Sequence, residues 1–260
     1  MTTMMIDPGL PTGAFTDVIA SHGEFVDIVK FGWGTALVTK DIDRKIGVLR
    51  EYGIDFYFGG TLFEYYVWTG RLDDYLAMLR CYGATHVEVS NGTIPLDQHG
   101  KAEYVRKLSG EMTVLSEVGY KDADRSALLT PADWVNALQE DLDAGASTVI
   151  TEARESGRSG IANKDGQMRD DVLLAVLDAI DPRKVMFEAP TKDLQVALIQ
   201  TVGPQVNLGN VAAADIIGVE TLRRGLRGDT LLQLTTGMQL TTGMQSTTGQ
   251  TAVYRTPSAA

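Results

Sequence analysis

Short apolar runs alternate with longer amphipathic stretches along most of this chain. Runs such as 26–31 (VDIVKF), 147–153 (STVITEA) and 184–189 (KVMFEA) are nearly continuous in apolar residues. Such runs are typical of parallel strands that are buried on both faces. We expect strands at residues 4–6, 25–31, 54–58, 85–89, 112–118, 147–153, 184–189 and 205–208.

The stretches between these strands have helical periodicity, and many of them end in glycine. Thr130-Pro131 is a good helix start, with threonine at the N-cap and proline in the first turn. The predicted helices span about 13–22, 40–52, 71–82, 102–107, 131–144, 171–180, 194–201 and 213–226. Eight strand–helix units predict an α/β fold, a (β/α)8 TIM barrel in one domain over residues 1–229, with an open doubly wound sheet as the alternative.

The composition changes after residue 229. The segment 235–239 (TTGMQ) is repeated at 241–245 and partly again at 247–250. Threonine, glycine, glutamine and serine without apolar periodicity cannot form a packed core. We therefore interpret 230–260 as a disordered, low-complexity tail.

Composition and charge restrict the class of protein. A hydrophobic content of 44% allows a sizeable core, and a net charge of −11 argues against nucleic-acid or anionic-membrane partners. No apolar run is long enough for a membrane span. Cys81 is the only cysteine, so no disulfide forms within this sequence, and we expect a reducing, cytoplasmic location. We also expect Cys81 to be a small buried residue late in its helix.

Polar and charged residues collect where the predicted strands end. The catalytic residues of a (β/α)8 barrel lie at this end of the strands. The stretch 149–161 (VITEARESGRSGI) is the densest example, because a strand leads directly into charges of both signs. The residues at these ends are Asp7, Lys30, Gly59, Gly60, Thr61, Glu64, Glu88, Ser90, Asn91, Glu117, Lys121, Asp122, Glu152, Arg154, Glu155, Glu188, Asn207 and Asn210. Any one carboxylate could instead form an ion pair that only holds a strand end.

The residue types narrow the chemistry. None of the three histidines falls at the carboxyl end of a predicted strand. No zinc cluster or P-loop motif is present either. Converging carboxylates suit a hard cation such as Mg²⁺. Lys30, Lys121 and Arg154 suit phosphate or carboxylate groups, and a lysine can also move a proton. The pattern predicts a Mg²⁺-assisted reaction on a small, multiply anionic substrate.

Eight segments in order are similar to one known family. They are VKFGWGT (29–35), GGTLFE (59–64), EVSNGT (88–93), SEVGYKD (116–122), EARESG (152–157), FEAP (187–190), VNLGN (206–210) and VETLRRGLRGDT (219–230). Together they resemble the phosphosulfolactate synthase family, which includes plant heat-stress-associated relatives. The resemblance covers residues 4–230.

The resemblance implies a (β/α)8 barrel and a Mg²⁺-dependent carbon–sulfur lyase of coenzyme M biosynthesis. The reaction would add sulfite to phosphoenolpyruvate and give phosphosulfolactate. Lys121, in EVGYKD, matches the family's general acid. For the metal we expect Glu152 and Glu188. For the anionic groups of the substrates we expect Lys30, Asn91, Arg154, Gly157, Asn207 and Asn210. The resemblance leaves a homo-oligomer open.

The sequence departs from the family's usual pattern at three places. The usual Asp-Lys-Gly at the end of the first strand is Asp7-Pro8-Gly9, the usual EVGKKD has Tyr120 as its fourth residue, and the basic segment before the first strand is missing. These departures leave two alternatives open. One is an enzyme of the same fold that acts on another enol phosphate or nucleophile, and the other is a non-catalytic, stress-associated family member.

Overall fold

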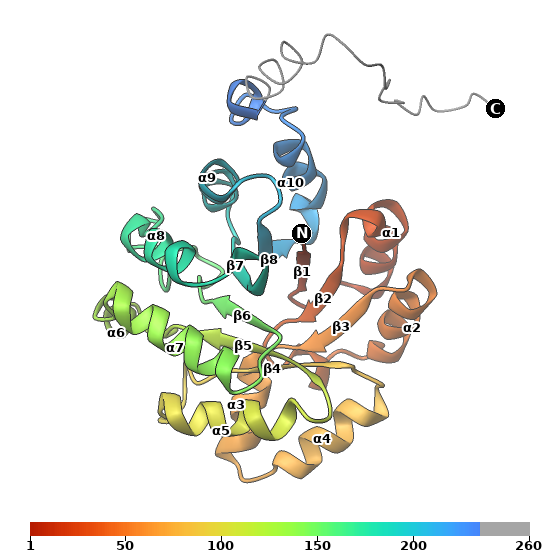
Figure 1. Cartoon of the computed structure of the whole chain (residues 1–260). Helices are drawn as coiled ribbons and strands as arrows, with labels where there is room; N and C mark the ends of the chain where they lie inside the picture. The colour runs from red at the N-terminus through yellow and green to blue at the C-terminus, as the bar shows by residue number, and fades with distance from the viewer. Residues whose placement is uncertain (235–260) are drawn as a thin grey trace, which may run out of the picture.

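Eight parallel strands surround a central axis, and the helices lie outside them (Figure 1). The structure is a computed structural model, and it describes residues 1–234. The strands are β1 (Thr3–Asp7), β2 (Ile28–Phe31), β3 (Asp55–Phe58), β4 (His86–Val89), β5 (Thr113–Val118), β6 (Thr148–Thr151), β7 (Val185–Glu188) and β8 (Asn207–Ala212).

The order of the strands confirms the predicted barrel. The hydrogen-bonded order is β3-β2-β1-β8-β7-β6-β5-β4, and the two end strands, β3 and β4, contact each other. Each strand therefore lies beside its neighbours in the sequence, and β1 lies beside β8. An open doubly wound sheet would instead reverse its strand order at a switch point.

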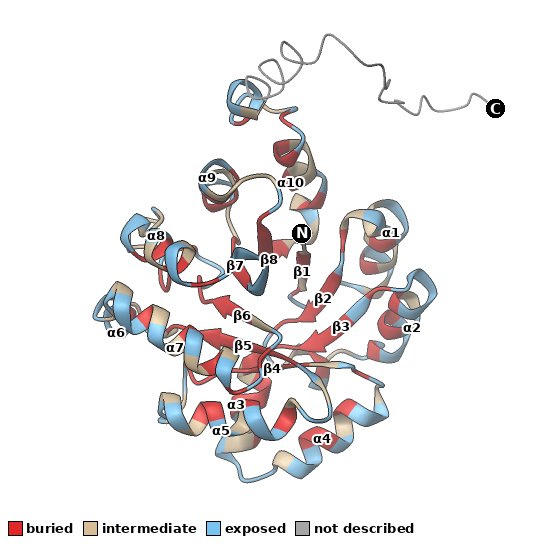
Figure 2. Ribbon diagram, viewed as in Figure 1, coloured by how far each residue is buried: buried red, intermediate tan, exposed pale blue. Residues whose placement is uncertain are grey.

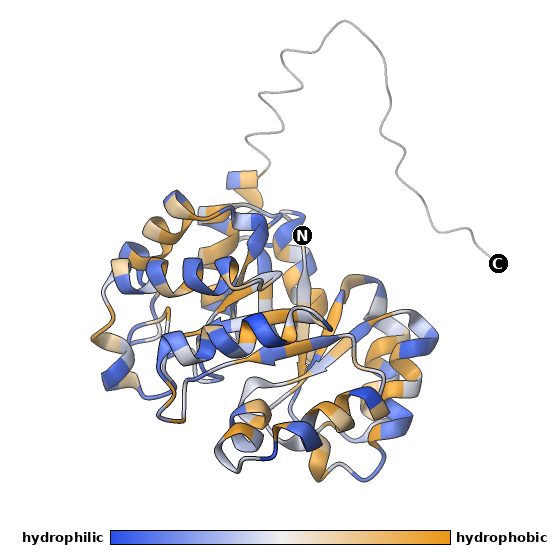
Figure 3. Ribbon diagram, turned by 60° about the horizontal axis from the view of Figure 1, so that its bottom comes forward, coloured by the Kyte–Doolittle hydropathy of each residue, from blue (hydrophilic) through white to orange (hydrophobic). Residues whose placement is uncertain are grey.

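The helices cover the outside of the barrel with their apolar faces turned inward. In Figure 2 their inner sides are red and their outer sides pale blue, and in Figure 3 they carry alternating orange and blue bands. The longer helices are α1 (Thr12–His22), α2 (Ile42–Tyr52), α3 (Gly60–Trp68), α4 (Leu72–Cys81), α5 (Gln98–Leu108), α7 (Pro131–Asp143), α8 (Asp170–Ala179), α9 (Lys192–Val202) and α10 (Ile216–Arg223). The predicted start of α7 is confirmed, because the Thr130 side chain accepts from Asp133 N and the Asp133 side chain accepts from Thr130 N.

The core has two parts. The larger part fills the space between the strands and the surrounding helices. The smaller part lies inside the barrel and consists of Met4, Ile28, Tyr57, Leu115, Ile150 and Met186. Side chains that fill the interior make a barrel a packed core and not a pore.

Two helices were not predicted. No helix was predicted between the strand at 54–58 and the helix at 71–82, but α3 starts at Gly60 and buries Leu62 and Phe63. A short helix, α6 (Ala123–Ala127), follows β5. The predicted burial of Cys81 is also wrong, because this last residue of α4 is exposed.

The last strand is shifted from its predicted position. The strand was predicted at 205–208, but β8 begins only at Asn207 and continues through Gly209 and Asn210 to Ala212. Gly209 faces the packed interior, where an added Cβ would lie 3.1 Å from the Met4 side chain and 3.2 Å from that of Met186. Glycine at this position therefore allows close packing within a strand.

The described chain extends slightly beyond the predicted domain boundary at 229. Thr230 is buried, and its Oγ1 donates to the carbonyl of Leu222. Leu234 packs against the main core. The rest of the predicted tail, 235–260, lies outside the described residues. Within 1–234 no helix combines the length and apolar character needed to cross a membrane.

Candidate active site

The alternation of side chains along the strands builds a charged layer directly above the apolar interior. Successive residues of a strand point to opposite faces, so residues two apart share a face. Four of the six interior residues are accordingly followed, two positions later, by a charged one near the carboxyl end of the strand. The pairs are Ile28 and Lys30, Leu115 and Glu117, Ile150 and Glu152, and Met186 and Glu188.

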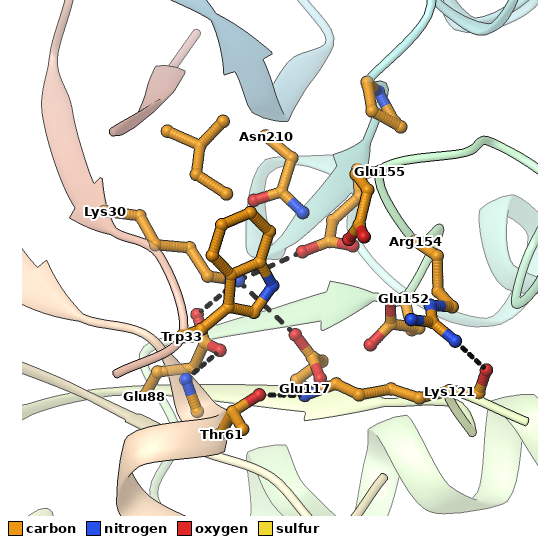
Figure 4. A pocket seen from close by; sticks show the side chains of 14 residues that line it. Lys30, Trp33, Thr61, Glu88, Glu117, Lys121, Glu152, Arg154, Glu155 and Asn210 are labelled. Carbon is orange, nitrogen blue, oxygen red and sulfur yellow. Dashed lines mark hydrogen bonds and ion pairs between the residues drawn. The ribbon is translucent and has the colours of Figure 1, made fainter. Parts of the chain in front are cut away.

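This charged layer forms the floor of a cavity of about 210 Å³ at the carboxyl ends of the strands (Figure 4). Its walls come from β-strand ends and from the loops that follow them. The lining residues are Ile6, Lys30, Trp33, Gly60, Thr61, Glu88, Glu117, Lys121, Glu152, Arg154, Glu155, Glu188, Pro190 and Asn210.

Lys30 lies among three glutamates at the bottom of the cavity. Its Nζ is 2.9 Å from Glu88, 3.2 Å from Glu188 and 3.5 Å from Glu117. Burial alone would lower the pKa of Lys30, but the carboxylates of Glu88, Glu188 and Glu117 outweigh it and raise the pKa well above its ordinary value. Lys30 is therefore a fixed positive charge whose nearest partners are protein carboxylates.

Glu117, Glu152 and Glu188 form a group that could hold a metal ion. One carboxylate oxygen from each lies within 4.8 Å of the others. Among the described residues, Glu117 Oε1 and Glu152 Oε2 are buried and accept no hydrogen bond from the protein. Buried carboxylate oxygens without a partner are costly unless a cation or water reaches them. The donor set consists only of oxygens, which fits a hard divalent cation.

The buried carboxyl groups have pKa values that differ from one another. Burial raises the pKa of Glu88 to about 7, although Lys30 opposes this change. Burial and the carboxylates of Glu117 and Glu188 raise the pKa of Glu152 well above its usual range. Burial would also raise the pKa of Glu117, but the ammonium groups of Lys121 and Lys30 lower it to about 2. Carboxyl groups are thus held close together, and a bound cation would reduce the repulsion between their negative charges.

Lys121 reaches the cavity from the loop after β5. Its Nζ donates to Thr61 Oγ1 at 2.6 Å and lies 3.7 Å from Glu64 Oε1. Burial works to lower the pKa of Lys121, but the carboxylates of Glu117, Glu152 and Glu64 raise it overall. The side chain is therefore an ammonium group at neutral pH and is able to donate a proton.

Arg154 lies at the entrance of the cavity. Its Nη1 donates to the backbone carbonyl of Lys121 at 3.2 Å, and the side chain is exposed (Figure 4). A guanidinium group has five N–H donors, so donors remain for an anionic ligand. Asn210, on β8, also lines the cavity and has a buried Oδ1 without a protein partner in the described chain.

The structure brings six of the predicted site residues into one cavity. They are Lys30, Lys121, Glu152, Arg154, Glu188 and Asn210.

The other three, Asn91, Gly157 and Asn207, lie outside this cavity. Asn91 donates to the carbonyl of Leu96 and lines a neighbouring hollow. Gly157 has a positive φ of 63° and lies against Thr191.

The expected place of Asn207 at the carboxyl end of its strand is wrong. β8 begins at Asn207, and its side chain donates to the carbonyls of Pro182, Arg183 and Val185 at the opposite end of the barrel. The error arose because the predicted strand, 205–208, began and ended a few residues too early.

Some residues of the cavity were not assigned a role from the sequence. Glu88 and Glu117 were recognised at strand ends, but only the structure places them on Lys30. For Glu117 the sequence held a usable signal, because it lies two positions after the apolar Leu115 and so shares its face of the strand. Thr61 was also recognised after the end of a strand, but its contact with Lys121 depends on α3, which was not predicted. Pro8, which replaces the usual lysine, is exposed and lines a separate surface hollow.

Solved structures support the fold. The barrel is similar to 3-hexulose-6-phosphate synthase with a TM-score of 0.56 and 16% sequence identity, covering 86% of this chain and 99% of that one. It is also similar to phosphonopyruvate hydrolase in complex with oxalate and Mg²⁺, with a TM-score of 0.52 and 12% identity, over 95% of this chain and 94% of that one. At these identities the likeness concerns the fold alone.

Sequence comparison is more specific. Residues 1–229 match the family model described as (2R)-phospho-3-sulfolactate synthase (ComA). The phosphosulfolactate synthase of Bacillus subtilis is 45% identical over 229 residues, which cover 88% of this chain and 91% of that protein. The enzyme of the same name from Methanocaldococcus jannaschii is 43% identical over 233 residues, covering 88% and 92%. The chain therefore belongs to the phosphosulfolactate synthase family.

Proposed function

We propose that this protein is a phosphosulfolactate synthase that adds sulfite to phosphoenolpyruvate. The observation that carries the proposal is the shared cavity of a protonated lysine, Lys121, and the carboxylates of Glu117, Glu152 and Glu188. An addition across an enol double bond needs a proton donor on one side and stabilisation of negative charge on the other. The names and the 40–45% identity of the relatives support the same activity.

We propose Mg²⁺ as the cofactor, with Glu117, Glu152 and Glu188 as the residues that would hold it. Their buried oxygens without protein partners support this assignment. Bound there, Mg²⁺ would neutralise the carboxylate cluster and stabilise negative charge on the substrate. It would also reduce the repulsion between an acidic protein and a substrate with several negative charges.

Lys121 is the proposed proton donor. The sulfur atom of sulfite forms a bond to the methylene carbon of phosphoenolpyruvate, and the electron pair of the double bond moves to the carbon that bears the phosphate group. Lys121 Nζ then delivers a proton to that carbon, and the product is phosphosulfolactate. Nearby carboxylates raise the pKa of Lys121, so its amine carries the proton before the transfer.

Arg154 and Asn210 are proposed to bind and orient the substrates. The exposed Arg154 guanidinium offers donors to phosphate or sulfite at the entrance. Lys30 is a weaker candidate for direct binding, because three glutamates already surround its ammonium group. The single cysteine of the sequence is consistent with a reducing, cytoplasmic location.

The test is an assay with purified protein, phosphoenolpyruvate, sulfite and Mg²⁺, in which phosphosulfolactate is detected by mass spectrometry. Lys121→Met should lower kcat by about 100-fold or more, which is the usual contribution of a positioned proton donor. Lys107→Met makes the same change on the exposed side of α5 and should leave kcat unchanged. EDTA should abolish turnover, and added Mg²⁺ should restore it.

Other results of this assay would support the alternatives. Binding of phosphoenolpyruvate without any product would indicate an enzyme that uses a different nucleophile. A protein that binds neither substrate would be a non-catalytic member of the family. Full activity of the Lys121→Met variant would remove the lysine from its proposed role.

A further inference from the structure

The segment GGTLFE (59–64) forms the start of α3, and the first turn of this helix faces the cavity. The Gly60 N–H donates to Glu88 Oε1 at 2.6 Å. A Cβ at Gly60 would clash with Ser90 Oγ and would lie only 2.6 Å from Glu88 Oε1. The absence of a side chain at Gly60 therefore lets α3 begin in direct contact with the end of β4.

Thr61 is the hydrogen-bond acceptor for Lys121. Its Oγ1 is 2.6 Å from Lys121 Nζ, and both residues line the cavity. Lysine has a flexible side chain with four carbons, and holding its end in one place costs conformational entropy. A fixed acceptor on a helix reduces the number of positions that the ammonium group can occupy.

Glu64 lies one helical turn after Thr61, on the same face of α3. Its side chain is 1% exposed, and it accepts from Ser90 Oγ at 2.6 Å. Its other oxygen accepts from the backbone N–H groups of Thr93 and Ile94 at 2.7 and 2.9 Å. Glu64 thus holds the loop 90–94 with a buried carboxylate, which also lies 3.7 Å from Lys121 Nζ.

The loop 90–94 in turn lies against Lys121. The Lys121 N–H donates to the carbonyl of Gly92 at 3.4 Å. A Cβ on Gly92 would be 3.4 Å from Cγ of Lys121, so the backbone runs close beside the lysine stem. Two segments of the chain, the start of α3 and the loop 90–94, therefore lie against Lys121, and Glu64 connects them.

We propose that Thr61 and Glu64 are positioning residues for the proton transfer by Lys121. Thr61 holds the ammonium group directly, and Glu64 acts through its charge and through the loop 90–94. This inference rests on the proposed function of Lys121, but the placement of the lysine can be tested independently. The inference also assigns α3, which carries both residues, a role in placing the proton donor.

The first test compares substitutions at the two ends of α3. Thr61→Val removes the hydroxyl group and nearly keeps the volume, and we expect kcat to fall by about 10- to 100-fold with KM changed by less than about twofold. Thr61→Ser restores the acceptor and should recover most of the lost rate. Thr69→Val makes the same change at the exposed end of α3, where Oγ1 donates to the backbone carbonyls of Tyr65 and Tyr66, and should keep the wild-type rate.

The second test measures the reactivity of Lys121 without turnover. Acetylation of each lysine by a small amine-reactive reagent is followed over time by peptide mass spectrometry. Loss of the Thr61 hydroxyl group removes a hydrogen bond to the charged form of the amine. Lys121 should therefore be acetylated at least about fivefold faster in Thr61→Val, and also in Glu64→Gln, while the other lysines react at wild-type rates.

The two tests separate the two proposals. A wild-type protein without synthase activity would refute the proposed function, while the acetylation rates would still decide whether Thr61 and Glu64 hold Lys121. A Thr61→Val variant with wild-type kcat and wild-type acetylation of Lys121 would overturn the inference. If Glu64→Gln fails to fold, Thr61→Val decides alone, because Thr61 is only half-buried at the cavity.

Discussion

Gly160→Ala should destabilise the protein strongly, because Gly160 lies directly against the backbone of Glu152. Gly160 has a φ of 74°, which side chains other than glycine rarely adopt. An added Cβ would overlap the Glu152 carbonyl oxygen and lie 2.5 Å from the carbonyl carbon. The same carbonyl accepts from the Ile161 N–H at 2.8 Å, so it cannot move away without breaking that bond.

The magnitude follows from two contributions. The left-handed backbone costs about 1–2 kcal/mol for a residue with a Cβ. Overpacking against a fixed backbone costs about 1–3 kcal/mol. We therefore expect Gly160→Ala to lower the free energy of unfolding by about 2–5 kcal/mol. Any relief of the clash would shift Glu152, one of the proposed metal ligands.

Urea denaturation followed by circular dichroism measures this loss. Gly110→Ala is the matched control, because a Cβ there would meet nothing within 4 Å and its φ is not positive. It should change the free energy of unfolding by less than about 1 kcal/mol. Binding of Mn²⁺, measured by titration calorimetry as a substitute for Mg²⁺, should weaken in Gly160→Ala. Equal stability of the two variants would refute the reasoning about Gly160.

Two further predictions concern buried charges. In metal-free protein the free energy of unfolding should fall as the pH rises from about 5 to 7, because the folded state keeps a proton on Glu88, whose pKa is about 7, while the unfolded state has lost it. Glu88 should contribute at most about 1.4 kcal/mol per pH unit to this slope, measured by urea denaturation at each pH. An equally steep slope in Glu88→Gln would contradict the assignment of the slope to Glu88. Lys101→Met should cost about 3–5 kcal/mol, because Lys101 and Asp141 form a fully buried pair at 2.7 Å and an unpaired carboxylate would remain. The same substitution at Arg80, whose ion pair with Glu111 is exposed, should cost less than about 1 kcal/mol, and similar melting temperatures for the two variants would count against this prediction.

Local patterns in the sequence were sufficient for most of the fold. Buried parallel strands are apolar throughout, and helices often end in glycine, so both signals lie within a few residues of the element they describe. The predictions failed where a residue had a tertiary reason for its presence. No helix was predicted at Gly60 and the last strand was ended before Gly209, but both glycines allow close packing against other strands.

Part of the site was also predictable. Lys121, Glu152, Arg154 and Glu188 were selected because each follows an apolar run at the carboxyl end of a strand, and all four line the cavity. The position of Asn207 failed, because a strand boundary placed a few residues too early moves a side chain to the other end of the barrel.

The sequence by itself determined the order of eight strand–helix units, the charged ends of the strands and the resemblance to a family. Only the tertiary structure decided which charged groups meet. Closure of the barrel brings β2, β4, β5 and β7 around one axis, so that Lys30 contacts glutamates far from it in the chain. It also places Thr61 beside Lys121, 60 residues away. Such contacts depend on how the whole sheet closes, and no local pattern of apolar and polar residues contains that information.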